Sequence, residues 1–202
     1  KHAVDIEWIE NNPVTNITKL KGGEYEAWPE TKLKAYENYC DRNNLSTARI
    51  IYELAIGTGQ RLGDCCTMKW SDFDGEYMSV IQQKTKKPLT IYTPSRLQDY
   101  LVQLPKRSTF ILGRNLTQHL GKRAVQKSVE TVRAAIGVAG IGNPARLVVH
   151  GWRYTAVTQL ADAGVSDSDI QAVSGHKTLA MIIKYRQQAN QKKASKRAQK
   201  AR

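Results

Sequence analysis

Apolar residues recur at helical spacing along most of the chain. Leu33 and Tyr36 follow Pro29, a residue type that often begins a helix, and Ile51 and Leu54 show the same spacing in the next segment. Helices are therefore predicted at about 4–10, 30–42, 46–56, 94–104, 118–138, 150–163, 167–174 and 178–188, with N-caps at Ser46, Thr117 and Ser166.

One stretch alternates with a period of two, which is typical of a β-strand. Tyr77, Ser79 and Ile81 mark alternate positions of a first strand, residues 89–92 supply the return strand, and the lysine-rich segment 84–88 connects them. This hairpin is the only clear β-structure in the pattern. The predicted fold class is thus α+β, mainly α-helical, with a small antiparallel β-sheet.

Composition and charge narrow the classes of molecule that the protein could bind. The chain has 202 residues with 31 Lys+Arg against 18 Asp+Glu, a formal charge of +13, and its 41% hydrophobic residues fit a globular domain rather than a disordered or fibrous chain. A basic protein gains affinity for polyanions by releasing their counterions. Seven of these charges lie between Arg186 and Arg202, which leaves +6 for the rest. Charge alone therefore also fits ribosomal or membrane-surface proteins, or an ordinary domain with a solvated tail.

Other composition features bear on the compartment. No run approaches the roughly 18–20 apolar residues that a membrane span needs. Cys40, Cys65 and Cys66 make an odd number, two of them adjacent, so a disulfide framework and a Cys-x-x-Cys metal site are not expected. We therefore expect a cytoplasmic protein in a reducing compartment, without a bound metal.

Four short stretches contain side chains that are costly to bury and well suited to bind a phosphate. Each stretch alone is a weak indication of a phosphate site, because an isolated arginine usually lies on the surface. Their residue types and order together are much more specific. The stretches are Gly59–Asp64, Gln83–Lys86, His150–Arg153, and Gly175-His176 followed nine residues later by Tyr185.

The chemistry of these residues suits attack on a phosphate. His150 and Arg153, at i and i+3 near a predicted helix start, can meet one anion together. Arg61 lies beside glycines that allow a close backbone approach, and Asp64 would orient Arg61 or a histidine. Tyr185 is the candidate nucleophile. A phenol has an ordinary pKa of about 10, so its attack needs nearby cations or a base.

These residues resemble the ordered signature of the tyrosine recombinases of the phage-integrase type, over about residues 28–188. That signature is Arg, a hairpin Lys, His-x-x-Arg, His or Trp, and Tyr. Lys84 matches the hairpin lysine best because Gln-x-Lys-Thr resembles the family pattern, and Lys86 is the second choice. The resemblance implies the tyrosine-recombinase catalytic-domain fold, with Arg61, Lys84, His150, Arg153, His176 and Tyr185 as catalytic residues and Asp64 as a supporting carboxylate.

The resemblance also implies a reaction. Tyr185 would attack a DNA phosphate, form a 3′-phosphotyrosyl bond and release a 5′-hydroxyl. Because bond energy is conserved, no metal, cofactor or ATP is implied. In this mechanism Arg61, Arg153 and His176 would hold the non-bridging oxygens, His150 would assist proton transfer at Tyr185, and Lys84 would protonate the leaving oxygen.

The partners implied by the resemblance are double-stranded DNA at a specific site, further copies of the chain in a DNA-bound homo-tetramer, and accessory DNA-bending proteins. No membrane partner is implied. An integrase of a temperate phage or genomic island is favoured over a chromosome-dimer resolvase. Two alternatives stay open: relaxation of one duplex, as a type IB topoisomerase performs it, and a catalytically silent DNA-binding module.

The resemblance divides the chain as well. The sequence begins in a predicted helix, which suggests an excised fragment, so residues 1–24 are expected to be the end of a truncated core-binding domain plus a linker. Residues 25–188 would form the catalytic domain and residues 189–202 a basic C-terminal tail. Further DNA contacts are expected at Lys86, Lys87, Lys192 and Lys193.

Overall fold

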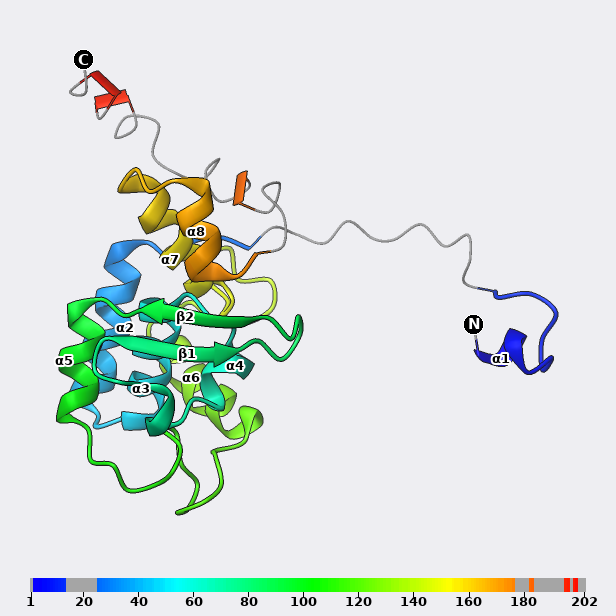
Figure 1. Ribbon diagram of the computed structural model, residues 1–202, viewed down its shortest axis with the longest axis horizontal. Helices are drawn as coiled ribbons and strands as arrows, with labels where there is room; N and C mark the ends of the chain where they lie inside the picture. The colour runs from blue at the N-terminus through cyan, green and yellow to red at the C-terminus, as the bar shows by residue number, and fades with distance from the viewer. Residues whose placement is uncertain (1, 14–24, 177–181, 184–194, 197, 200–202) are drawn as a thin grey trace.

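The computed structural model describes residues 2–13, 25–176, 182–183, 195–196 and 198–199. Helices make up most of this part, and a two-stranded antiparallel sheet lies on one side of them (Figure 1). The predicted α+β, mainly helical class is therefore confirmed. The elements are α1 His2–Asp5, α2 Glu30–Arg42, α3 Ser46–Thr58, α4 Leu62–Cys66, the 3-10 turn η1 Trp70–Asp72, β1 Tyr77–Ile81, β2 Pro88–Tyr92, α5 Ser95–Gln103, α6 Lys122–Ala135, α7 Gly151–Asp162 and α8 Asp167–Ser174.

Helix α3 runs through the core and packs against α2, α4, α5, α6 and α7. Ile51 and Leu54, which the helical spacing placed on the inner face, are fully buried. Ala48 and Tyr52 are buried as well, because a helix with neighbours on several sides needs apolar residues around most of its circumference. The α3–α4 turn is thereby held against the body of the protein.

An aromatic cluster fixes the start of α7. Trp152, fully buried, meets the rings of Trp28, Tyr36 and Tyr52 at centroid distances of 5.5, 5.1 and 5.4 Å. Gly151 makes this approach feasible, since an added Cβ would lie only 2.5 Å from the Glu26 carbonyl oxygen. The residues on either side of Trp152 consequently have little freedom to move.

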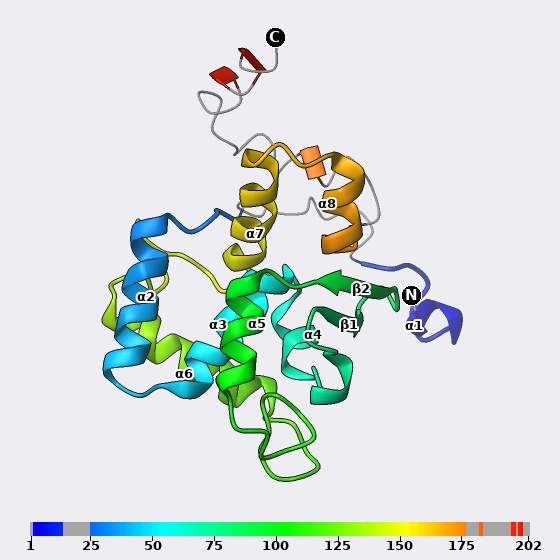
Figure 2. The same ribbon diagram turned by 60° about the vertical axis from the view of Figure 1, so that its left-hand side comes forward.

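The hairpin pairs β1 with β2 from Tyr77 opposite Tyr92 to Ile81 opposite Pro88. Met78 and Val80 occupy the buried face of β1, whereas the alternate positions named from the sequence are exposed. The connection spans 82–87, two residues earlier at its start than predicted. Helix α8 packs on β2, and α7 and α8 lie side by side above the sheet (Figure 2).

Some predicted helix boundaries are wrong. Helix α6 begins at Lys122 after Gly121, not at an N-cap at Thr117, because the Asn115 side chain accepts hydrogen bonds from the N–H groups of Thr117 and Gln118 and stabilises a turn there. Leu45 rather than Ser46 precedes α3. The predicted cap at Ser166 is confirmed by a 3.2 Å hydrogen bond from the Asp169 N–H.

Near the N-terminus, only His2–Asp5 of the segment predicted as helical forms a helix, and Glu7 has a positive φ of 58° that ends it. Most of the predicted helix 178–188 lies outside the described residues. Within the part of the chain that the structure describes, no helix combines the length and the apolar character that crossing a membrane requires.

Candidate active site

The turn between α3 and α4 carries Arg61. Gly59 ends α3 with a φ of 65°, a conformation that favours glycine, and Arg61 then takes the N-cap position of α4. Nη1 of Arg61 is buried and has no hydrogen-bond acceptor among the described residues, while Oδ2 of Asp64 lies 3.8 Å away. Leaving a buried N–H unsatisfied costs free energy, so this atom is suited to receive an anionic ligand.

Asp64 joins this turn to the hairpin. Its Oδ1 accepts a hydrogen bond of 2.8 Å from the backbone N–H of Gln83, whose side chain donates to the Gly63 carbonyl at 3.1 Å. Lys84 is the next residue and is exposed in the connection between β1 and β2. One carboxylate therefore contacts both Arg61 and the base of the segment that carries Lys84.

Arg153, on the first turn of α7, is buried with 2% of its surface exposed. Its Nη1 donates to the Gly59 carbonyl at 2.8 Å and its Nη2 to the Ser174 carbonyl at 2.7 Å. The same Nη2 lies 3.1 Å from Nε2 of His176. Arg153 thereby connects the α3–α4 turn with the end of α8.

His176 follows Gly175, which ends α8 with a φ of 68°. Because a guanidinium can only donate, Nε2 of His176 must accept from Arg153. The ring proton then resides on Nδ1 and is donated to Oγ of Ser174 at 2.6 Å. His176 is in this way a neutral imidazole with both ring nitrogens engaged.

His150 occupies the N-cap position of α7. Its half-buried ring meets the rings of Tyr25 and Tyr154 edge to face, at centroid distances of 4.8 and 5.8 Å. Tyr25 belongs to the segment that crosses the start of α7, where the Trp28 N–H donates to Oγ1 of Thr155 at 2.7 Å. Packing therefore orients the His150 ring.

The candidate side chains lie close enough together to shift one another's pKa values. Burial, followed by the charges of Arg153, Arg61 and Lys84, lowers the pKa of His150 to about 4. Burial, followed by the charges of Arg153 and Arg61 and by His150, lowers the pKa of His176 to about 3. Both imidazoles are thus neutral at pH 7, in a strongly positive local field. Such a field would stabilise the negative charge that develops on a phosphate under attack.

Comparison with known proteins agrees with this arrangement. Residues 30–192 match the phage integrase family, a span that includes every predicted catalytic residue. The chain belongs to the phage integrase family. Its relatives include the integrase of Escherichia phage HK022, which is 32% identical over 147 residues. That alignment covers 68% of this chain but only 40% of the relative, so the matched part is less than half of the phage HK022 protein.

Two solved structures share the fold. A lambda integrase dimer bound to a COC′ core site has a TM-score of 0.72 and 26% identity, covering 93% of this chain and 55% of that one. A lambda integrase tetramer bound to a Holliday junction has a TM-score of 0.73 and 23% identity, with the same two coverages of 93% and 55%. The fold of this phage integrase family member is therefore that of the lambda integrase catalytic domain.

Three of the predicted positions cannot be placed. Tyr185, Lys192 and Lys193 lie outside the described residues. Ile182, three positions before Tyr185, is described, and it is buried in a small apolar cluster with Val157 and Ile170. The chain thus returns to α7 and α8 shortly before the predicted nucleophile.

Sequence reasoning missed three buried polar residues that support the site: Gln60, Gln82 and Ser174. A signal for Gln82 was present, because the inward positions Met78 and Val80 of β1 continue with period two to this glutamine. A polar residue in a buried register position needs a hydrogen-bonded partner, which a single sequence does not identify.

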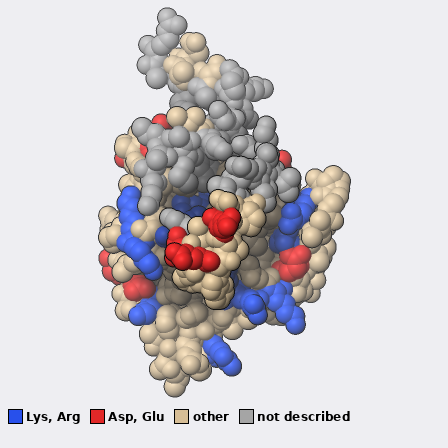
Figure 3. Space-filling model, turned by 90° about the vertical axis from the view of Figure 1, so that its right-hand side faces the viewer, with Lys and Arg blue, Asp and Glu red and all other residues tan. Residues whose placement is uncertain are grey.

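Basic side chains flank the site. Figure 3, which looks at the molecule from the side of the hairpin connection, shows lysine and arginine side chains on both flanks of this face. Lys86 and Lys87 belong to the connection itself.

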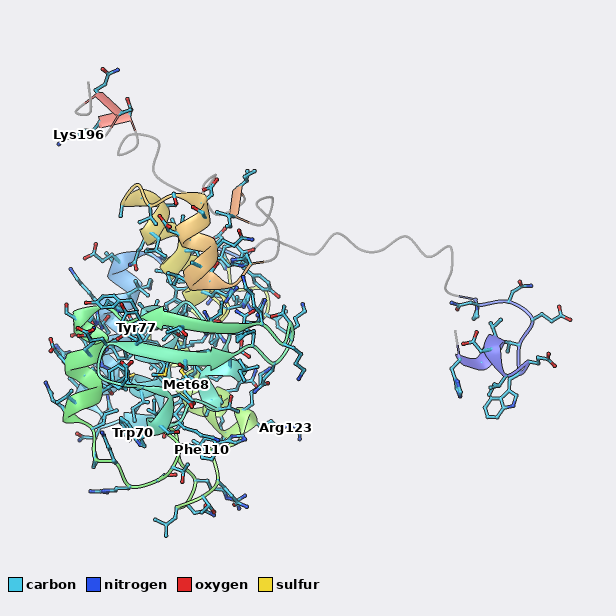
Figure 4. The ribbon with its side chains drawn as sticks, in the orientation of Figure 1. Met68, Trp70, Tyr77, Phe110, Arg123 and Lys196 are labelled. Carbon is cyan, nitrogen blue, oxygen red and sulfur yellow. The ribbon has the colours of Figure 1, made fainter. Side chains whose placement is uncertain are left out.

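Trp70 and Phe110 lie below the sheet in Figure 4, away from α7 and α8. In the described part of the chain, no three His, Cys, Asp or Glu side chains are grouped so that they could hold a metal ion.

Proposed function

We propose that this member of the phage integrase family is a site-specific DNA recombinase that breaks and rejoins duplex DNA through a 3′-phosphotyrosyl intermediate. The observation that carries the proposal is the buried Nη1 of Arg61, which has no acceptor in the described residues, beside the Arg153–His176 pair. A phosphodiester is an anion whose non-bridging oxygens match such donors. The integrase name of the phage HK022 relative and the DNA-bound lambda integrase structures support this choice of anion.

The proposed first step exchanges one ester bond for another. The phenolic oxygen of Tyr185 forms a bond to phosphorus, and the bond from phosphorus to the 5′-oxygen of the next nucleotide breaks. The phenolic proton passes to His150, which is neutral at pH 7 because burial and the neighbouring cations lower its pKa to about 4. The ammonium of Lys84 gives a proton to the leaving 5′-oxygen. In the second step a 5′-hydroxyl attacks the phosphotyrosyl bond and these transfers reverse.

Arg61, Arg153 and His176 hold the non-bridging oxygens in this scheme. His176 does so as the other tautomer, with its proton on Nε2 facing the phosphate and Nδ1 accepting from the Ser174 hydroxyl. Negative charge increases on the non-bridging oxygens during attack. Two guanidinium groups that are fixed before the reaction begins stabilise this charge without reorganisation. Asp64 keeps Arg61 and the hairpin in place through the contacts described above. Lys86, Lys87, Lys192 and Lys193 contribute contacts to the DNA backbone, which hold the duplex but read no sequence.

The same proposal covers the assembly and the division of the chain. Strand exchange joins two duplexes, so four copies act together on DNA, as in the lambda integrase tetramer bound to a Holliday junction. Residues 1–24 are the end of a core-binding domain and a linker, residues 25–188 the catalytic domain, and residues 189–202 a basic tail. The protein acts in the cytoplasm, on the bacterial nucleoid or in the host cell of a phage, with accessory DNA-bending proteins as further partners.

A nicked suicide duplex tests the reaction. The fragment lost after cleavage cannot return, so a covalent protein–DNA adduct accumulates with wild-type protein and not with Tyr185→Phe. An adduct formed by Tyr185→Phe would show that another residue is the nucleophile. If this chain gives no adduct, the assay is repeated on a chain extended at its N-terminus, and failure there would refute cleavage and leave a DNA-binding module.

A second assay separates recombination from relaxation. Supercoiled DNA that carries the target site is incubated with a labelled partner duplex. The proposal predicts that the label is joined to the plasmid, whereas relaxed topoisomers without label transfer would identify an activity of the topoisomerase IB type.

A further inference from the structure

Two glutamines, Gln60 and Gln82, face each other beneath the hairpin, with exposed fractions of 1% and 0%. Nε2 of Gln82 donates to Oε1 of Gln60 at 2.7 Å and to the Ser174 carbonyl at 3.0 Å. Nε2 of Gln60 donates in turn to the carbonyls of Val173 and Thr58 at 2.9 and 3.1 Å. Every amide hydrogen of the pair is therefore used, which fixes the orientation of both side chains.

This pair shares an acceptor with the candidate active site. The carbonyl oxygen of Ser174 accepts from Gln82 and also from Nη2 of Arg153. The hydroxyl of Ser174 contacts Nδ1 of His176 at 2.6 Å. A displacement of Gln82 would therefore act on the two side chains that are proposed to hold the phosphate.

The end of α8 fits closely against this pair. A Cβ at Gly175 would lie 2.6 Å from Nε2 of Gln82 and 2.8 Å from Cδ1 of Leu89. Contacts this short do not occur with a side chain, so glycine is required both for the approach and for the φ of 68°. The hairpin and the end of α8 are consequently packed as one unit at this point.

The pair also reaches the segment that carries Lys84. Oγ1 of Thr85 donates to Oε1 of Gln82 at 2.7 Å, and Lys86 N–H donates to the Gln82 carbonyl at 2.8 Å. Lys84 thus directly precedes two residues that are hydrogen-bonded to Gln82, although its own side chain is exposed.

We infer that Gln82, supported by Gln60, is a positioning residue for the reaction: it sets the distance between Lys84 on the hairpin and the Arg153–His176 group. The inference rests on the proposed function, in which Lys84 protonates the leaving oxygen. A buried polar network whose members are all hydrogen-bonded specifies one arrangement of the three segments. A flexible lysine needs such a support, because a misplacement of about 1 Å can cost roughly 100-fold in rate.

The test compares two leaving groups. Gln82→Met keeps the volume and removes the amide, and single-turnover cleavage is measured on a suicide duplex with the normal 5′-oxygen and on one with sulfur at that bridging position. A thiolate leaves without a proton, since thiols are much stronger acids than alcohols. We expect Gln82→Met to slow cleavage of the oxygen substrate by about 10- to 100-fold, and that of the sulfur substrate by less than about threefold.

Controls separate the outcomes. Gln103→Met removes an exposed glutamine at the end of α5 and should leave both rates unchanged. Thr85→Val removes only the hydroxyl that contacts Gln82 and should show the same sulfur rescue to a smaller extent, even if Gln82→Met does not fold. Equal slowing on both substrates, or no slowing, would overturn the inference. No cleavage of either substrate by the wild-type chain or by the chain extended at its N-terminus would instead refute the proposed function.

Discussion

Two regions of the protein bury arginine and its partners in different ways. Between α2, α3 and α5, the buried carboxylate of Glu53 pairs with Arg96 at 2.6 Å and with Arg49 at 3.0 Å. In the candidate active site, Arg153 donates instead to the backbone carbonyls of Gly59 and Ser174. The first region matches its arginines with carboxylates, whereas in the second the hydrogen bonds of Arg153 are satisfied by neutral oxygens.

This difference shows how a fold can separate structural charge from charge that is available to a ligand. A carboxylate cancels the charge of its partner, but a carbonyl satisfies the N–H and leaves most of the positive potential in place. Burial is the main cause of the lowered pKa of His150, and the charges of Arg153, Arg61 and Lys84 lower it further, in agreement with such a potential. An anionic phosphate is the type of group that such a site binds.

The largest effect is expected from Arg153→Lys. Lysine keeps the charge, but one ammonium on a flexible stem cannot reproduce the fork that bonds Gly59, Ser174 and His176. Cleavage of the suicide duplex should fall by about 100- to 1,000-fold, measured in a single turnover. Arg96→Lys, the matched change in the other region, should alter the rate per folded molecule by less than about threefold. Equal losses in both variants would refute the contrast.

Glu53→Gln should have the opposite effect to Arg153→Lys: it should reduce stability and leave the cleavage rate nearly unchanged. It leaves Arg96 and Arg49 beside a neutral amide, so the free energy of unfolding should fall by about 2 to 3 kcal/mol, less than for a fully buried pair because Arg96 is half exposed. Urea unfolding measures the loss. Cleavage per folded molecule should stay within about threefold of wild type. A stable variant without cleavage would mean that this cluster, too, serves the reaction.

The sequence predicted the residues of the site better than their supports. Order and spacing pointed to Arg61, His150 and Arg153 as candidates, because the pattern is local within each stretch, and their catalytic roles stay predictions. The acceptors of Arg153 were not predictable, since the Gly59 carbonyl is 94 positions away in the sequence and a backbone oxygen leaves no trace in residue type. Glu53 gave no signal of burial for the same reason, as its partner Arg96 lies 43 residues later.

Helix boundaries failed where side chains compete with the backbone. The start of α6 was placed too early, because Asn115 stabilises the preceding turn and apolar periodicity does not report such a local bond. The hairpin itself was predicted, since alternation and a lysine-rich connection are strong signals. The role of Tyr185 as nucleophile stays a prediction.

A moderate effect is expected from pH. The pKa of His176 is about 3 in the folded protein, below the ordinary value of about 6.5, so between these values the unfolded chain binds a proton that the folded one does not. Stability should therefore fall as pH falls. From pH 7 to pH 5 the loss due to this residue is on the order of 1 to 2 kcal/mol, and His176→Asn should remove that part of the slope. An unchanged slope in urea titrations would contradict a neutral, buried His176.

The smallest effect is expected from a substitution of Tyr25, whose ring lies against His150. Burial is the main cause of the lowered pKa of His150, and the Tyr25 ring, 4.8 Å away, contributes to that burial. Tyr25→Leu should admit water and raise the pKa of His150 above about 4, as NMR titration would detect, and slow cleavage by roughly two- to tenfold, the range expected for one aromatic contact. Tyr77→Leu is the matched control, because Tyr77 is a similarly exposed tyrosine whose ring pairs with Tyr92 on the sheet. If both variants leave the pKa of His150 unchanged, the Tyr25 ring does not contribute to the burial that lowers it.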